Sequence, residues 1–209
     1  MATTAGNPSS SSSSERRLLD AGKRLFAAQG YENTTTSSIA RAAGTSESQL
    51  VKLFGGKEGL LQRIFEEGWL KLHFVYAAAS VSTTPLDGLR VIFELLIKML
   101  SQDRELRDLM LFESRRIRGK SSAILVTSGY HRLQEEVSQV VERVLHGSAL
   151  EGKIRPGAVA SALIGMLESM LRDQAMSERK TGTAEPTSDE IRTMFRILST
   201  CLAKAGPVQ

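Results

Sequence analysis

Apolar residues recur at helical spacing in almost every segment after Glu15, and this periodicity limits the fold more than any other feature. Residues three and four positions apart lie on one face of an α-helix, whereas a half-buried strand needs apolar residues at alternate positions. No segment of the sequence shows that alternation. The chain of 209 residues is therefore expected to adopt an all-α fold.

The segment Glu15–Leu61 begins with a predicted helix and a short second helix. The first helix carries its apolar residues on one face and ends at Gly30, a residue suited to the left-handed conformation that closes helices. Thr35 is a natural N-cap for the second helix, because its hydroxyl can accept a hydrogen bond from a free backbone N–H. Gly44 ends the second helix, so a tight turn is expected there.

A third short helix is predicted to begin at Ser46, with Gln49 three positions later. This spacing is typical of a capping box, in which two side chains each bind the other residue's backbone N–H. Leu50 and Phe54 are expected to point inward. A glycine pair then ends the helix before Lys57 starts a long fourth one.

The sequence predicts three parts: a tail, a helix-turn-helix domain and a helical bundle. Residues 1–14 are rich in serine and carry little apolar surface, which predicts a flexible tail. Residues 15–61 form the helix-turn-helix domain, and residues 62–209 form a domain for ligand binding and dimerisation. Its helices after the fourth are predicted from Pro85 to Leu100, around Leu106–Phe112, from about Ser121 to Leu145, after Gly157 and around Ile191–Leu202.

In a helix-turn-helix, the last helix stands out from the surface and enters a DNA major groove about 12 Å wide. Gln49 can pair with adenine, Val51 can contact a thymine methyl group, and Lys52 can neutralise a phosphate. Glu47 suits the helix dipole but repels phosphate. The residues predicted to contact duplex DNA are Thr35, Ser37, Thr45, Ser46, Ser48, Gln49, Val51, Lys52, Leu53 and Lys57.

Each of these assignments has an alternative. Gln49 is equally suited to completing its capping box, and Lys57 could be an ordinary solvated lysine rather than a phosphate ligand at a helix start. Val51 and Leu53 are aliphatic residues on a helix with one buried face, so they require a partner. A helical module that binds a protein through Val51 and Leu53 is therefore the alternative to a DNA reader.

The sequence LLDAGKRLFAAQGYENTTTSSIARAAGTSESQLVKLFGGKEGLL resembles the TetR family of bacterial transcription regulators over about 45 residues. The resemblance implies a nine-helix homodimer in which the first three helices read DNA and the remainder holds a small-molecule pocket. Family members are mostly repressors that an inducer releases from DNA. Val51 and Leu53 depart from the family, which usually has tyrosine at the first position and often tyrosine or histidine at the second.

The C-terminal domain contains candidate residues for an effector pocket and for a dimer interface. Pockets are usually apolar with few polar groups, and the residues with that character are Trp69, His73, Phe74, Phe93, Phe112, Glu113, Arg116, Tyr130 and His131. Small and apolar residues on the last two helices predict close helix packing in a homodimer: Ser161, Leu163, Gly165, Met166, Ser169, Met170, Ile191, Phe195 and Leu198. For both sets, packing within the chain's own core is the alternative.

No catalytic, cofactor or metal site is predicted. The sequence has one cysteine, Cys201, and three separated histidines, and it lacks a nucleophile with a base, paired carboxylates and a phosphate-binding glycine loop. The N-terminus has neither the basic start nor the apolar run of a signal peptide. We therefore expect a cytoplasmic bacterial regulator, associated with the nucleoid when bound to DNA, with an unknown small-molecule effector.

Overall fold

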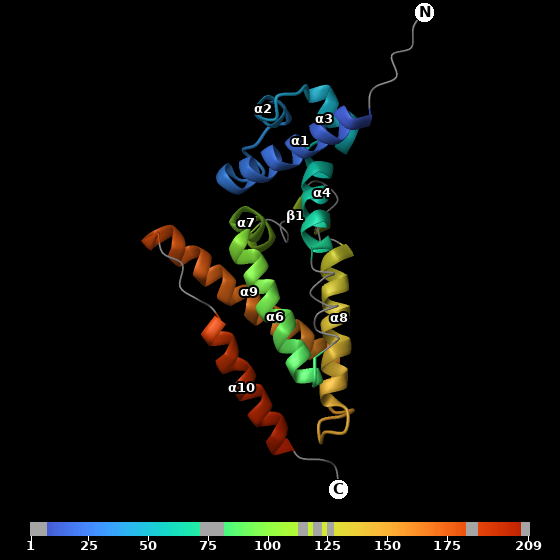
Figure 1. Ribbon diagram of the computed structural model, residues 1–209, viewed down its shortest axis with the longest axis vertical. Helices are drawn as coiled ribbons and strands as arrows, with labels where there is room; N and C mark the ends of the chain where they lie inside the picture. The colour runs from blue at the N-terminus through green and yellow to red at the C-terminus, as the bar shows by residue number, and fades with distance from the viewer. Residues whose placement is uncertain are drawn as a thin grey trace, which may run out of the picture. The chain divides into compact units, whose positions relative to one another are not determined.

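The computed structural model describes residues 8–71, 82–112, 117–118, 123–124, 128–182 and 188–205. The chain divides into two compact units, one of Met1–Gly68 with Glu105–Thr127 and one of Trp69–Arg104 with Ser128–Gln209. Within the described ranges it forms nine helices and one pair of two-residue strands (Figure 1). The all-α class is confirmed.

The first unit contains α1 (Pro8–Gln29), α2 (Thr36–Ala42), α3 (Glu47–Phe54), α4 (Lys57–Leu70) to Gly68, and most of α7 (Arg104–Phe112). Helix α1 begins seven residues earlier than the sequence predicts, so residues 8–14 are helical rather than a flexible tail. Proline is favoured at the first helical position because its fixed φ suits the helix and its missing N–H needs no partner there. The serines that follow therefore extend the amphipathic helix toward its N-terminus.

The core of the first unit joins α1, α2, α3 and α4. Its fully buried side chains are Leu18, Phe26, Ile39, Leu50, Leu60, Leu61 and Phe65, and full burial of each stabilises the fold by about 1.5–3 kcal/mol. A Cβ at Gly22 would lie 2.7 Å from the Leu60 side chain. A larger residue at position 22 would therefore force the buried Leu60 side chain to shift, so glycine suits the close packing of α1 on α4.

The second unit contains α6 (Pro85–Gln102), α8 (Ser128–Leu145), α9 (Pro156–Thr181) and α10 (Ser188–Ala205). Helix α8 packs against α9 and α6, and α10 packs against α6. Apolar faces with helical spacing form this core, as the periodicity predicts, and α6 buries Leu89, Ile92, Phe93 and Leu96.

One predicted helix start is wrong. Helix α8 begins at Ser128 and not near Ser121, and the preceding residues include β1 (Ile117–Arg118) and β2 (Ala123–Ile124). These strands pair antiparallel with Ile117 opposite Ile124. Their backbone N–H and C=O groups therefore form hydrogen bonds between the strands, and not along a helix. None of the described helices has the length and apolar character needed to cross a membrane.

Candidate nucleic-acid interface

Reciprocal side-chain bonds define the start of α2. The Thr35 hydroxyl accepts a hydrogen bond from the Ser38 backbone N–H at 3.1 Å, and the Thr35 N–H donates to the Ser38 hydroxyl at 3.2 Å. This is a complete capping box. Thr35 is therefore the N-cap, as predicted, and its hydroxyl has an intramolecular partner.

Helix α3 has half of the predicted capping box. The Ser46 hydroxyl accepts from the Gln49 N–H at 3.2 Å, but within the described residues the Gln49 side chain does not return a bond to Ser46. Gly55 closes the helix in the left-handed conformation, with a φ of 73°. The Gln49 amide, which is half-buried, therefore remains available for another partner.

Two long-range contacts hold the turn between α2 and α3. The Arg17 guanidinium donates to the Ala43 carbonyl at 3.0 Å and also reaches the hydroxyls of Ser13 and Ser14. The Thr36 hydroxyl, on the first residue of α2, donates to the Glu47 carboxylate on the first residue of α3. Helix α3 is thus oriented by contacts with both α1 and α2.

The outer face of α3 is exposed, while its inner face is buried at Leu50. Ser48 and Lys52 are exposed, and 50% of Val51 is accessible. In the described part of the chain, Lys52 has neither a hydrogen bond nor an ion pair. Leu53 and Thr45 are half-buried at the edges of this face. The predicted contact residues on α3 therefore lie together on a single accessible surface.

Several other predicted contact groups have structural partners. The hydroxyls of Ser46 and Ser48 lie 2.9 Å apart. The Lys57 ammonium donates to the Tyr31 carbonyl at 2.9 Å and lies 4.1 Å from the centroid of the Tyr31 ring, a cation–π contact. Phosphate binding by Lys57 stays a prediction, with a structural role now established beside it.

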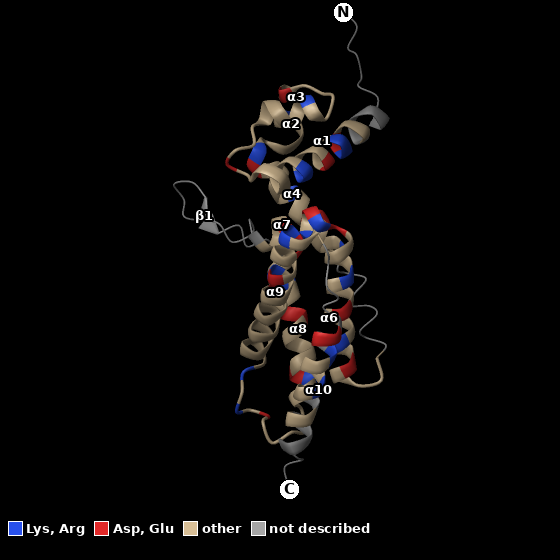
Figure 2. Cartoon of the chain, turned by 90° about the vertical axis from the view of Figure 1, so that its left-hand side faces the viewer, with Lys and Arg blue, Asp and Glu red and all other residues tan. Residues whose placement is uncertain are grey.

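Arg41 is an exposed residue that was not predicted to contact DNA. It lies in the last turn of α2, four positions after the exposed Ser37, so both side chains lie on one face of that helix. Arg41 has no side-chain partner among the described residues. The signal in the sequence was the i,i+4 spacing from Ser37. Figure 2 shows basic and acidic residues mixed along α1.

In the second unit, the structure brings together three of the predicted effector-pocket residues. The ring centroids of Trp69 and Tyr130 lie 6.1 Å apart, and those of Tyr130 and His131 lie 6.5 Å apart. A Cβ at Gly129 would lie 2.2 Å from the Trp69 ring. The indole therefore packs directly on the backbone of α8.

Other predicted residues lie in the core or outside the described residues. Phe93 is fully buried, and its ring centroid lies 5.8 Å from that of Phe195, which was assigned to the dimer interface. Leu163, also assigned there, is buried in the same chain. These three residues therefore have core partners, in accordance with the alternative stated for them. His73, Phe74, Glu113 and Arg116 lie outside the described residues, as do the side chains of Phe112 and Ile191.

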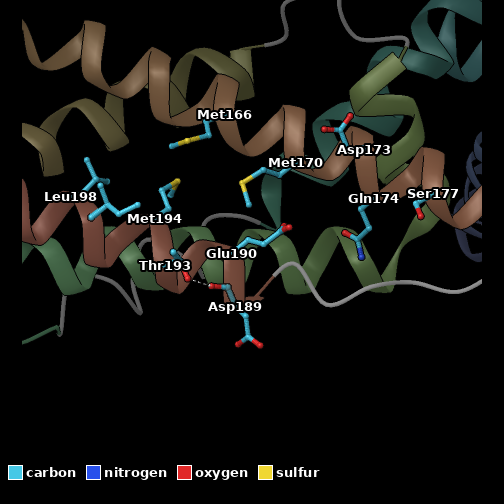
Figure 3. Close-up of a pocket in the computed structure, with 11 residues that line it drawn as sticks. Met166, Met170, Asp173, Gln174, Ser177, Asp189, Glu190, Thr193, Met194 and Leu198 are labelled. Atoms are coloured by element: carbon cyan, nitrogen blue, oxygen red, sulfur yellow. Dashed lines mark hydrogen bonds between the residues drawn. The ribbon is translucent and has the colours of Figure 1, made fainter.

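A groove of about 980 Å³ runs between α9 and α10. Met166 and Met170 from α9 and Met194 and Leu198 from α10 contribute its apolar lining (Figure 3). Asp173, Asp189 and Glu190 add carboxylates. Helix α9 also exposes three small residues of the predicted dimer interface: Ser161, Gly165 and Ser169. The Ser161 hydroxyl accepts a hydrogen bond from the Gln134 amide at 2.8 Å.

The N-terminal residues match a known family. Residues 18–64 match the model of the bacterial regulatory proteins of the tetR family. The similarity to this family therefore lies in the N-terminal helix-turn-helix segment. An uncharacterized HTH-type transcriptional regulator, YvkB of Bacillus subtilis (strain 168), is 36% identical to it over 52 residues. That alignment covers 25% of this chain and 28% of YvkB, so the chain matches about a quarter of the relative's length.

Several solved structures have a similar fold over nearly the whole chain. The fatty acid degradation regulator FadR from Bacillus halodurans has a TM-score of 0.75 at 16% identity, covering 93% of this chain and 96% of its own. FadR from Bacillus subtilis, in complex with stearoyl-CoA, has a TM-score of 0.74 at 14% identity, covering 93% and 99%. AibR, in complex with isovaleryl coenzyme A and operator DNA, has a TM-score of 0.68 at 19% identity, covering 88% and 97%. These likenesses show that the chain shares its fold with these three proteins.

Proposed function

We propose that this protein is a ligand-responsive transcriptional repressor that binds a palindromic operator as a homodimer. The observation that carries the proposal is the accessible outer face of α3, where Val51 and Lys52 are exposed above the buried Leu50. Two such helices related by a two-fold axis read half-sites about 34 Å apart. The operator DNA bound by AibR supports this function for the fold.

Retardation of the DNA fragment upstream of the protein's own gene tests operator binding. We expect a retarded complex at low salt, weakened by Lys52→Ala and by Arg41→Ala, because each removes a cation without an intramolecular partner in the described residues. Deletion of the gene should raise transcription from the bound promoter. If the folded wild-type protein does not retard the DNA, the proposal is contradicted. If transcription falls after deletion of the gene, the protein is an activator and not a repressor.

A protein-binding module remains the second candidate, because 50% of Val51 is accessible on a helix that otherwise presents polar residues. The same experiment separates the two candidates. Loss of DNA retardation in folded Lys52→Ala supports the DNA reader. Absence of any DNA complex, together with a protein complex that Val51→Ser abolishes, supports the module. For the DNA reader we further expect cytoplasmic localisation on the nucleoid.

The homodimer would use the exposed face of α9 and α10. Met166, which is 38% exposed, and Ile197, which is 60% exposed, line the groove between these helices, and exposed apolar surfaces of this kind often bind a partner. Ile197→Glu should convert the dimer to a folded monomer in light scattering. Ile154→Glu, on an aliphatic residue that is 39% exposed outside the groove, is the matched control.

Acyl-CoA thioesters are the first effector class to test, since FadR from B. subtilis is bound to stearoyl-CoA and AibR to isovaleryl coenzyme A. Trp69 is the sole tryptophan and packs beside Tyr130, so its fluorescence should report effector binding. An effector acts only if its affinity differs between the DNA-binding and released states. We expect a saturable fluorescence change and release of DNA with a thioester but not with free CoA. If neither short-chain nor long-chain acyl-CoA thioesters change the fluorescence or release the DNA, acyl-CoA thioesters are not the effector.

A further inference from the structure

Glu47 occupies the position on α3 from which a side chain most readily reaches a base. It is the first residue of the helix and is exposed. The N-terminal residues of a recognition helix are those that contact base edges in the major groove. Glu47 also precedes Val51 by four positions, so the two side chains lie in one row on the outer face of the helix.

A contact from α2 orients the Glu47 carboxylate. One carboxylate oxygen, Oε1, accepts the hydrogen bond from the Thr36 hydroxyl. In the described residues Glu47 has no ion pair, and its other oxygen, Oε2, has no hydrogen-bond donor. The side chain is therefore held in place before DNA arrives and keeps one acceptor free. Such preorganisation reduces the entropy lost on binding.

The charge of Glu47 makes its effect on binding depend on sequence. A carboxylate is repelled by the phosphates of any duplex. In the major groove it can only accept hydrogen bonds, and cytosine presents its N4 amino group there as a donor without an acceptor of its own. The contact with cytosine offsets the repulsion, whereas guanine and thymine present acceptors that add to it.

We propose that Glu47 is a specificity-determining residue that selects cytosine in each half-site, and that Thr36 is the residue that positions it. This inference rests on the proposed DNA-binding function. The four residues from Glu47 to Val51 span about 6 Å along the helix, compared with about 3.4 Å per base pair. The selected cytosine should therefore lie one or two base pairs from a thymine whose methyl group contacts Val51.

Selection of duplexes from a randomised pool tests the assignment, and it works for an operator of any sequence. The wild-type protein should enrich a palindrome with cytosine at one position of each half-site. Glu47→Ala should reduce the preference for cytosine over the other bases about tenfold at that position only. Thr36→Val should weaken the same preference. Glu32→Ala, which removes an exposed acid from the α1–α2 connection, should leave it unchanged.

A second measurement separates base reading from a general effect of charge. Glu47→Ala should bind unrelated DNA more tightly than wild type, because the repulsion is lost for every sequence while the cytosine contact is lost for one. The ratio of operator to unrelated DNA affinity should therefore fall. A ratio equal to that of the wild type would overturn the inference.

The outcomes distinguish this inference from the function on which it rests. Enrichment of no sequence by the folded wild-type protein overturns both. A palindrome whose cytosine preference is unchanged in Glu47→Ala overturns the base assignment alone. If Glu47→Ala does not fold, Glu47→Gln decides, because its amide still accepts from Thr36 and favours adenine. Adenine at that position then supports the inference, and unchanged cytosine overturns it.

Discussion

At the residue scale, two lysines that resemble each other in the sequence have different environments. Lys52 is exposed and lacks a partner in the described residues, whereas Lys57 binds the carbonyl and the ring of Tyr31. Lys57→Ala should lower the free energy of unfolding by about 1 kcal/mol, since a hydrogen bond from a cation and a cation–π contact are lost. Lys52→Ala should leave it within about 0.5 kcal/mol of wild type. Urea denaturation checks both, and equal stabilities would contradict the structural role of Lys57.

Glu151, in the connection between α8 and α9, offers a second prediction at this scale. The Gly147 backbone N–H and the His146 ring each lie 2.8 Å from its carboxylate oxygens, and these bonds lower the pKa of Glu151 below its ordinary value of 4.5. A carboxyl with a lowered pKa stabilises the folded state above its ordinary pKa, and that contribution is lost as the pH falls through the lowered value. An NMR titration should give a pKa below 4.5 that rises in His146→Ala. A wild-type value at or above 4.5 would contradict the contact.

At the scale of elements, the junction of α3 and α4 determines how the exposed helix is held. A Cβ at Gly59 would lie 1.8 Å from the Phe54 carbonyl oxygen, so the two helices can meet this closely only at glycine. Gly59→Ala should therefore lower the free energy of unfolding by about 1–3 kcal/mol, as overpacking does. It should also weaken DNA binding, because α3 must shift.

The matched control for this junction is Gly157→Ala in α9, where the added methyl group meets, among the described residues, only the Ser138 hydroxyl at 3.8 Å. Alanine has the higher helix propensity, so this variant should be as stable as wild type or more stable by up to about 1 kcal/mol. Thermal unfolding of both variants checks the pair. Equal losses would show that the Gly59 contact is unimportant.

At the scale of the whole molecule, Gly165 tests the homodimer. It is exposed on α9, and a Cβ there would meet no atom within 4 Å among the residues that the structure describes. A larger side chain at this position is expected to act mainly on a second copy, because a two-fold interface would bring the same stripe of small residues together. Gly165→Leu should weaken the dimer at least tenfold in sedimentation equilibrium and retain full helicity. A dimer of unchanged affinity would exclude this stripe from the interface.

The local pattern of residues was sufficient to predict the helices and their order. Spacing of three and four, a threonine cap at residue 35 and glycines at residues 30, 44 and 55 act over a few neighbouring positions. Two errors occurred where the local signal was weak. The serine run before Glu15 has no apolar face, yet it extends α1, and the residues before Ser128 contain a strand pair formed between separate segments.

The tertiary structure was needed to assign roles to individual polar groups. Arg17 binds a carbonyl 26 positions away, Lys57 reaches Tyr31 over the same separation, and Thr36 binds Glu47 across 11 positions. Helical periodicity contains no information on such pairs, because a hydrogen bond depends on the positions of two atoms in space and not on the spacing within one helix. The sequence therefore specified a helix-turn-helix and its exposed face, while folding determined which polar side chains on that face remained free.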